Sequence, residues 1–127
     1  MIAPAGQCAY ATSKFAVRGF SEAVRHELAG SNVGLSVVHP AGVKTAIARR
    51  GRLPAGLAES RKAEGIASLD RLSKTTPDQA AERILRGVEK KEPRILIGSD
   101  ARVIDVMQRL KPASYWNLMA RGYNLKL

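Results

Sequence analysis

Two short apolar segments most constrain what this chain can fold into. They are Leu35–Val38 and Arg94–Ile97, and both have the length and the apolar, partly β-branched character of buried strands. A helix is predicted between them, and a strand, a helix and a strand in this order form a right-handed parallel crossover. The sequence therefore predicts an α/β fold with parallel strands whose sheet is covered by helices.

The helix between these strands has a clear start. Thr76 can act as its N-cap, Pro77 occupies a first helical position where its missing N–H costs nothing, and Gln79 completes a capping box. Pro93 prevents the helix from continuing past Lys91. The predicted buried face of this helix consists of Ala80, Ala81, Ile84, Leu85 and Val88.

An earlier helix is predicted from Gln7 to Ala29, after a loop over residues 1–6. Tyr10 and Lys14 are four residues apart in it, so their side chains lie on the same helical face. A free phenol is almost wholly protonated at neutral pH, and a nearby ammonium group stabilises the phenolate. The pair therefore suits proton transfer, although a surface lysine lying over a packed tyrosine has the same spacing.

The residues around this pair resemble a known family. The run Tyr-Ala-Thr-Ser-Lys-Phe-Ala-Val-Arg-Gly-Phe is followed by Gly34–Pro40 and then by Ala41-Gly42-Val43-Lys44-Thr45. This order resembles the second half of a short-chain dehydrogenase/reductase, a family of NAD(P)-dependent oxidoreductases on a Rossmann fold. The resemblance implies a partial Rossmann-like doubly wound fold. Residues 1–98 would form the carboxyl-terminal half of the catalytic domain, and residues 99–127 an amphipathic helical tail.

The resemblance also implies site residues. Tyr10 corresponds to the catalytic acid/base, and Lys14 to the lysine that assists the tyrosine and hydrogen-bonds the nicotinamide ribose of NAD or NADP. The segment Pro40–Thr45 looks like the loop that closes over the nicotinamide and the pyrophosphate, with Pro40, Gly42, Val43 and Thr45 as cofactor-binding residues. It reads Pro-Ala-Gly where the family usually has Pro-Gly, so the backbone at Ala41 is less free. No metal is expected.

Other parts of the family pattern are not found in this sequence. Only nine residues precede Tyr10, and the family's catalytic serine lies further upstream. No G-x-G-x-x-G follows a predicted strand. We therefore expect a truncated enzyme, the carboxyl-terminal half, that is marginally stable or needs a partner because its sheet edges and apolar helix faces would be exposed.

The Gln7–Ala29 helix is predicted to be covered on two sides. The family resemblance makes it a homo-oligomer surface, and packing on another helix of the same chain is the alternative. Its two stripes are Tyr10, Lys14, Val17, Ser21, Val24 and Leu28 on one side, and Ala9, Ala16, Phe20 and Ala23 on the other.

Two further segments bear on the substrate. Residues 46–75 correspond to the family's mobile substrate-covering loop, which Leu53, Leu57, Ile66 and Leu69 would line. After Gly98, Ser99-Asp100 would cap a helix with one apolar face, and a short turn would follow Pro112. This tail either docks on its own core, contacts a membrane surface or closes a lipid-like substrate pocket. The predicted apolar face is Val103, Ile104, Met107 and Leu110.

Composition narrows the remaining classes. The net charge of +10 is concentrated around residues 49–74, where no aromatic residues are interleaved to stack bases, so a solvated basic segment is favoured over a nucleic-acid site. The single cysteine, Cys8, is predicted to be a small packed residue, and the lack of a second cysteine fits a reducing cytoplasm. His39 is predicted to be a loop histidine with a backbone partner, and no segment approaches a membrane span.

Three functions follow as hypotheses. The first is hydride transfer between NAD(P) and a small carbonyl compound or alcohol, with Tyr10 as acid/base. The second is a non-catalytic remnant that acts as a partner-binding subunit. The third is a basic nucleic-acid-binding domain.

Overall fold

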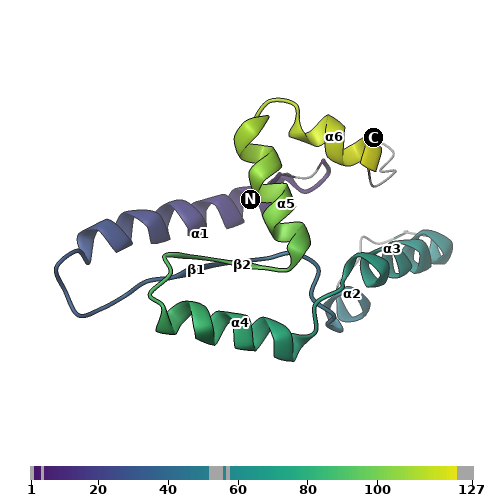
Figure 1. The fold of residues 1–127 in the computed structure, drawn as a ribbon. Helices are drawn as coiled ribbons and strands as arrows, with labels where there is room; N and C mark the ends of the chain where they lie inside the picture. Colours follow the sequence, from purple (N-terminus) through teal and green to yellow (C-terminus); the bar gives the residue numbers. More distant parts are fainter. Residues whose placement is uncertain (1, 4, 52–55, 57, 123–127) are drawn as a thin grey trace.

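The computed structural model describes residues 2–3, 5–51, 56 and 58–122 of the chain (Figure 1). One helix precedes the first strand, three helices lie between the two strands, and two helices follow the second strand. The elements are α1 (Cys8–Glu27), β1 (Val37–Pro40), α2 (Ile47–Arg50), α3 (Glu59–Leu72), α4 (Pro77–Glu89), β2 (Arg94–Ile97), α5 (Ser99–Leu110) and α6 (Tyr115–Gly122).

The described strands form a parallel pair, so the α/β, partial Rossmann-like prediction is confirmed. Val37 is paired with Arg94 and Pro40 with Ile97. The second strand lies where the sequence predicts it. The first begins two residues later than predicted and includes Pro40. The Val37 amide donates to the Pro93 carbonyl and the Ala41 amide to the Ile97 carbonyl. Pro40 lies between these donors at a position whose N–H would point away from β2, so its missing N–H costs no hydrogen bond between the strands.

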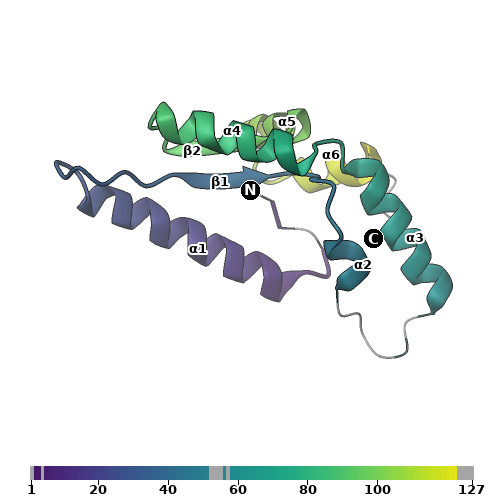
Figure 2. The same cartoon turned by 90° about the horizontal axis from the view of Figure 1, so that it is seen from below.

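The two faces of the sheet are covered by different helices (Figures 1 and 2). Ile95 and Ile97 are buried under α4, where they form the core with Ala80 and the half-buried Ile84. Successive strand residues point to opposite faces, so Arg94 and Leu96 of β2, with their paired residues Val37 and His39 of β1, face the side of α1 and α5. The candidate site lies on this second face.

Helix α4 starts as predicted. The Gln79 amide donates to Thr76 Oγ1 at 3.2 Å, and the Thr76 amide donates to Gln79 Oε1 at 3.0 Å. Its predicted buried face is only partly right, because Ala81 is exposed, Leu85 is 64% exposed and Val88 is 54% exposed. A sheet with this few described strands covers only the narrow stripe of Ala80, Ile84 and Gly87, and a Cβ on Gly87 would come within 2.5 Å of Ile95 Cδ1.

Helix α1 lies along β1 and buries only Ala11 completely. Among the described residues nothing covers its outer side, where Phe20 is 72% exposed, so the alternative of packing on another helix of the same chain is not found there. Cys8 is also exposed and is not a packed residue. The outer side as a homo-oligomer surface stays a prediction.

Residues 46–75 contain two helices rather than an irregular loop. Helices α2 and α3 contact each other, and Arg49 forms an ion pair with Asp70 at 2.9 Å. Of the predicted lining residues, Ile66 is half-buried and Leu69 is 52% exposed, whereas Leu53 and Leu57 lie outside the described residues. In Figure 1 this pair of helices extends away from one end of the sheet.

After β2 the chain forms α5 and α6, and the predicted apolar face of α5 is only partly right. Ala101, Ile104 and Asp105 face the sheet side, whereas Val103 is 64% exposed and Leu110 is 77% exposed. The helix is preceded by Gly98 with φ of 92° and has no side-chain N-cap. In α6, Met119 is buried, and the Tyr115 hydroxyl accepts a 3.2 Å hydrogen bond from the Ala3 amide.

Candidate active site

Tyr10 and Lys14 lie in the first turns of α1, one above the other. The Lys14 ammonium is 5.6 Å from the centroid of the Tyr10 ring, within the range of a cation–π contact. Tyr10 is 58% exposed, so a ligand can reach its hydroxyl. The helical spacing that the sequence provides therefore brings the phenol and the ammonium together on an accessible face.

The pair lies at the edge of a cavity of about 470 Å³ between α1, the sheet and α5. This volume is typical of small-molecule sites. Its lining includes Tyr10, Lys14, Pro40 and Ala41, and its walls are mostly apolar. The remaining lining residues are Ile2, Ala11, Val17, Arg18, Val37, Val38, His39, Arg94, Leu96, Ala101, Ile104 and Asp105.

Only part of the predicted cofactor-binding loop lines the cavity. Pro40 lines the cavity, whereas Gly42, Val43 and Thr45 do not. Val43 forms an isolated parallel bridge with Thr75, and the Gly42 amide donates to Asp100 Oδ2 at 3.3 Å. A Cβ on Gly42 would lie 2.5 Å from the Leu72 carbonyl oxygen, so glycine is required for the loop to pass this closely. The Thr45 hydroxyl faces the Ile47 amide at 3.5 Å.

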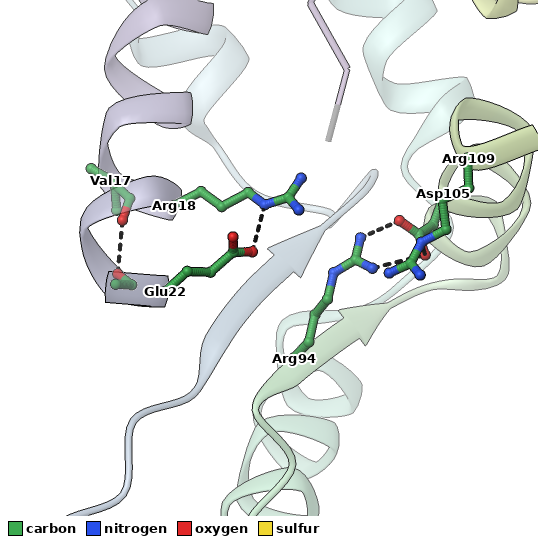
Figure 3. Close-up of polar contacts among 7 residues, drawn as sticks. Val17, Arg18, Glu22, Arg94, Asp105 and Arg109 are labelled. Atoms are coloured by element: carbon green, nitrogen blue, oxygen red, sulfur yellow. Dashed lines mark hydrogen bonds and ion pairs between the residues drawn. The ribbon is translucent and has the colours of Figure 1, made fainter. Parts of the chain in front are cut away.

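The cavity lining also includes Arg94 and Asp105, two members of a polar network that the sequence analysis did not predict. Figure 3 shows that both terminal nitrogens of the Arg94 guanidinium donate to the Asp105 carboxylate, Nη1 to Oδ2 at 3.0 Å and Nη2 to Oδ1. Arg109 Nε lies 3.1 Å from Oδ2 of the same carboxylate. The hydrogen bonds and charge of Arg94 hold the pKa of Asp105 below its usual range. The sequence signal for this network is Asp105 itself, an acidic residue that directly follows the apolar Ile104 on the side of α5 that faces the sheet.

Arg18 approaches the same region from α1 (Figure 3). Its Nε donates to Glu22 Oε1 at 2.8 Å, and that hydrogen bond lowers the pKa of Glu22. Arg18 and Glu22 are four residues apart, so the pair is a local helix contact. It orients the guanidinium over the sheet, where it lines the cavity.

His39 is not the loop histidine that the sequence predicts. It lies in β1, is only 9% exposed, and its Nε2 has no hydrogen-bond partner among the described residues. Burial, and then the positive charge of Arg94, lower the pKa of His39 to about 4. The prediction failed because the strand continues past Val38, so His39 faces the interior instead of leaving the sheet.

This shift predicts a pH-dependent stability. The unfolded histidine takes up a proton below about pH 6.5, whereas the folded one stays neutral until about pH 4, so stability is constant above that window and falls as the pH drops through it. We expect urea unfolding at about pH 4.5 to show a loss of about 2 kcal/mol relative to neutral pH. His39→Gln should remove most of this pH dependence of the unfolding free energy. His26→Gln, at an exposed histidine, is the control and should keep it. An equal pH dependence in the parent and both variants would show that His39 does not cause it.

Comparison with known proteins decides the family. The family model described as short chain dehydrogenase matches residues 2–54, which include Tyr10, Lys14 and the loop after β1. The chain belongs to the short-chain dehydrogenase family. No solved structure matches it.

Three curated relatives are similar over most of the chain. "Putative oxidoreductase SadH" of Mycobacterium tuberculosis is 41% identical over 124 residues, covering 96% of this chain and 44% of that protein. "Dehydrogenase/reductase SDR family protein 7-like" of Drosophila melanogaster is 29% identical, covering 91% and 34%. The mouse "short-chain dehydrogenase/reductase family 9C member 7" is 31% identical, covering 82% and 31%. The chain thus spans less than half the length of these relatives.

None of the helices in the described part of the chain is long and apolar enough to cross a membrane. None of the described histidine, cysteine, aspartate and glutamate residues gather in threes or more as a metal site would require.

Proposed function

We propose that this chain carries the catalytic tyrosine and lysine of an NAD(P)-dependent oxidoreductase that interconverts a carbonyl compound and an alcohol. The observation that carries the proposal is the exposed Tyr10 hydroxyl, with the Lys14 ammonium over its ring, at the edge of a mostly apolar cavity. Membership of the short-chain dehydrogenase family supports it. When bound, the nicotinamide cofactor supplies or removes the hydride.

The chain's own residues handle the proton. In the reducing direction Tyr10 donates its hydroxyl proton to the carbonyl oxygen, which becomes the alcohol, and in the oxidising direction the phenolate takes the proton back. Lys14 stabilises the phenolate because its positive charge lies within a few ångströms of the ring. Most of the cavity lining beside this pair is apolar, as in other small-molecule sites.

The residues present fit the nicotinamide-ribose end of the cofactor. Lys14 offers an ammonium donor to ribose hydroxyls, and Pro40 and Ala41 provide a short apolar wall beside Tyr10. Gly42, Val43 and Thr45 would contribute on the phosphate side. The Gly42 amide now donates to the Asp100 carboxylate, so a phosphate could use this amide only after Asp100 had moved away.

Cofactor binding tests the proposal. Titration of the full chain with NADH and with NADPH, followed by the fluorescence of the nicotinamide, should show saturable binding by one of them. Lys14→Met should weaken binding about tenfold, as expected for a lost hydrogen bond from a charged donor. Lys62→Met, at a partly exposed lysine of α3 outside the cavity, is the matched control and should leave the affinity unchanged. Unchanged fluorescence up to millimolar cofactor would overturn the proposal for this chain.

A further inference from the structure

Helix α5 has two different sides. Its inner side contacts β2 and lines the cavity with Ala101 and Ile104. Its outer side carries Val103, Val106 and Leu110, which lie on one face because the second and third are three and seven residues after the first. These three residues form the outer stripe of α5, and they are 64%, 55% and 77% exposed.

The outer stripe differs from the apolar residues that occur singly on most protein surfaces. It runs for about 10 Å along the helix, from Val103 to Leu110. The solvent side of a helix that packs on a sheet is normally polar, because only the inner stripe is buried. Continuous exposed apolar surface with a charged rim is typical of sites that contact a membrane or another protein.

The rim of the outer stripe is basic. Arg102 and Arg109 are seven residues apart and border the stripe on the side of Val106, and Lys111 directly follows the last residue of the stripe. Arg102 and Lys111 are exposed, and the Arg109 side chain is 63% exposed. These three residues form the basic rim.

The acidic residues of α5 are engaged elsewhere. Asp100 accepts a hydrogen bond from the Gly42 amide at 3.3 Å. Asp105 is buried on the inner side, where two nitrogens of Arg94 donate to it and Arg109 Nε lies 3.1 Å away. Because Asp105 already pairs with Arg94, the basic rim stays net positive.

An apolar stripe with a basic rim fits an anionic lipid surface. Apolar side chains of an interfacial helix enter the boundary between headgroups and acyl chains, and long basic side chains reach the lipid phosphates and carboxylates. One basic residue near an anionic bilayer raises the affinity about fivefold. A nucleic-acid surface fits less well, because valine and leucine offer no ring on which a base can stack.

We propose that helix α5 docks on the surface of an anionic membrane, with the outer stripe inserted between the lipids and the basic rim at their headgroups. The helix lies along the interface, and its 12 residues are too few to cross it. Docking brings the cavity on the inner side of α5 to within about 10 Å of the lipid surface, the diameter of one helix. The proposal is independent of the reaction at Tyr10, because no cofactor or proton transfer enters it.

Cosedimentation of the full chain with lipid vesicles tests the proposal. Vesicles of phosphatidylcholine and phosphatidylserine should bind the chain, and vesicles of phosphatidylcholine alone should bind it about tenfold more weakly. Val103→Gln with Leu110→Gln should weaken binding to the anionic vesicles about tenfold, because two apolar side chains no longer enter the lipid.

The matched control is Leu85→Gln with Val88→Gln in α4, which covers the opposite face of the sheet. These residues are 64% and 54% exposed, so they are as accessible as the outer stripe, and the control should bind like the parent. Both double variants keep the net charge of +10, so the general attraction of a basic chain to anionic vesicles is the same in both.

The basic rim is tested by a second pair of variants. Arg102→Gln with Lys111→Gln should weaken binding by more than about tenfold, because both charges lie at the headgroups. Arg61→Gln with Lys74→Gln removes the same charge from exposed positions in and after α3, and it should weaken binding by less than about threefold.

No sedimentation with anionic vesicles, or an equal loss in the α5 and α4 double variants, would overturn the proposal. A parent chain that is a dimer without lipid, and an α5 double variant that is a monomer, would also overturn it, since the outer stripe would then be a protein contact. DNA binding that depends on the basic rim, without any effect of the rim on vesicle binding, would assign the rim to nucleic acid instead. Circular dichroism and urea unfolding check that the variants are folded, and Leu110→Gln alone, at the most exposed residue, should still weaken binding about threefold.

Discussion

Tyr10→Phe should lower the rate of NAD(P)H-dependent carbonyl reduction by a factor of about 10² to 10⁴, the range that a positioned general acid contributes. The phenylalanine keeps the ring under the Lys14 ammonium and removes only the proton donor. The side chain is 58% exposed, so the free energy of unfolding should change by less than about 0.5 kcal/mol. The measurement is the loss of NADH or NADPH absorbance with a panel of aldehydes and ketones, together with urea unfolding.

The matched control is Tyr115→Phe, which removes a phenol in α6 outside the cavity. This variant loses the hydrogen bond from the Ala3 amide and should keep the full rate. A Tyr10→Phe protein that retains its rate would show that Tyr10 is not the proton donor. Turnover in neither the parent chain nor the control would contradict the proposed activity for this chain.

Asp105→Asn should destabilise the fold by about 3–5 kcal/mol, the usual cost of removing one partner from a buried ion pair. Asp105 is 8% exposed and accepts hydrogen bonds from Arg94, whose side chain is 18% exposed, and from Arg109. Without the carboxylate charge, the Arg94 guanidinium is left buried with no counter-charge. Domains are stable by only about 5–15 kcal/mol, so the urea midpoint should fall steeply.

Two further variants separate the charge from the volume. Glu82→Gln breaks an ion pair with Arg86 whose side chains are 62% and 61% exposed, and it should change stability by less than about 0.5 kcal/mol. The double variant Arg94→Met with Asp105→Leu should recover most of the lost stability, because apolar residues can replace a buried ion pair. A midpoint for Asp105→Asn equal to that of Glu82→Gln would show that the pair carries little of the fold's stability.

Acid should act on the same region in two steps. The depressed pKa of Asp105 means that its contribution is present above the pKa of an unfolded aspartate and is lost as the pH falls through the lower, folded value. The loss at His39 comes first, at higher pH, since the unfolded histidine protonates first.

Local patterns determined much of this protein. The capping box at Thr76, the strand Arg94–Ile97 and the one-turn spacing of Tyr10 and Lys14 depend on residues close in the sequence, and the structure contains all three. The residue order around Tyr10 also indicated the family, and the comparisons establish it. Hydrogen bonds and helical spacing within a few residues do not need the rest of the fold to form.

Other features depend on which elements meet. Leu85 and Val88 belong to the apolar stripe of α4, yet they are exposed because the described sheet reaches only Ala80, Ile84 and Gly87. The loop pattern predicts that Gly42 and Pro40 bind the cofactor together. In the structure only Pro40 lines the cavity, because the Gly42 amide donates to the Asp100 carboxylate instead. Burial is decided by the extent of the neighbouring layer, which periodicity does not contain.

The sequence by itself determined the two strands and the helix that leads into the second, the one-turn spacing of Tyr10 and Lys14, and the family. Only the tertiary structure decided that Arg18, His39, Arg94 and Asp105 share one cavity with that pair. These residues are separated by up to 87 positions, from Arg18 to Asp105 (105 − 18), and come from α1, β1, β2 and α5. Charged side chains so far apart in the sequence interact only because the parallel crossover places their elements on one face of the sheet.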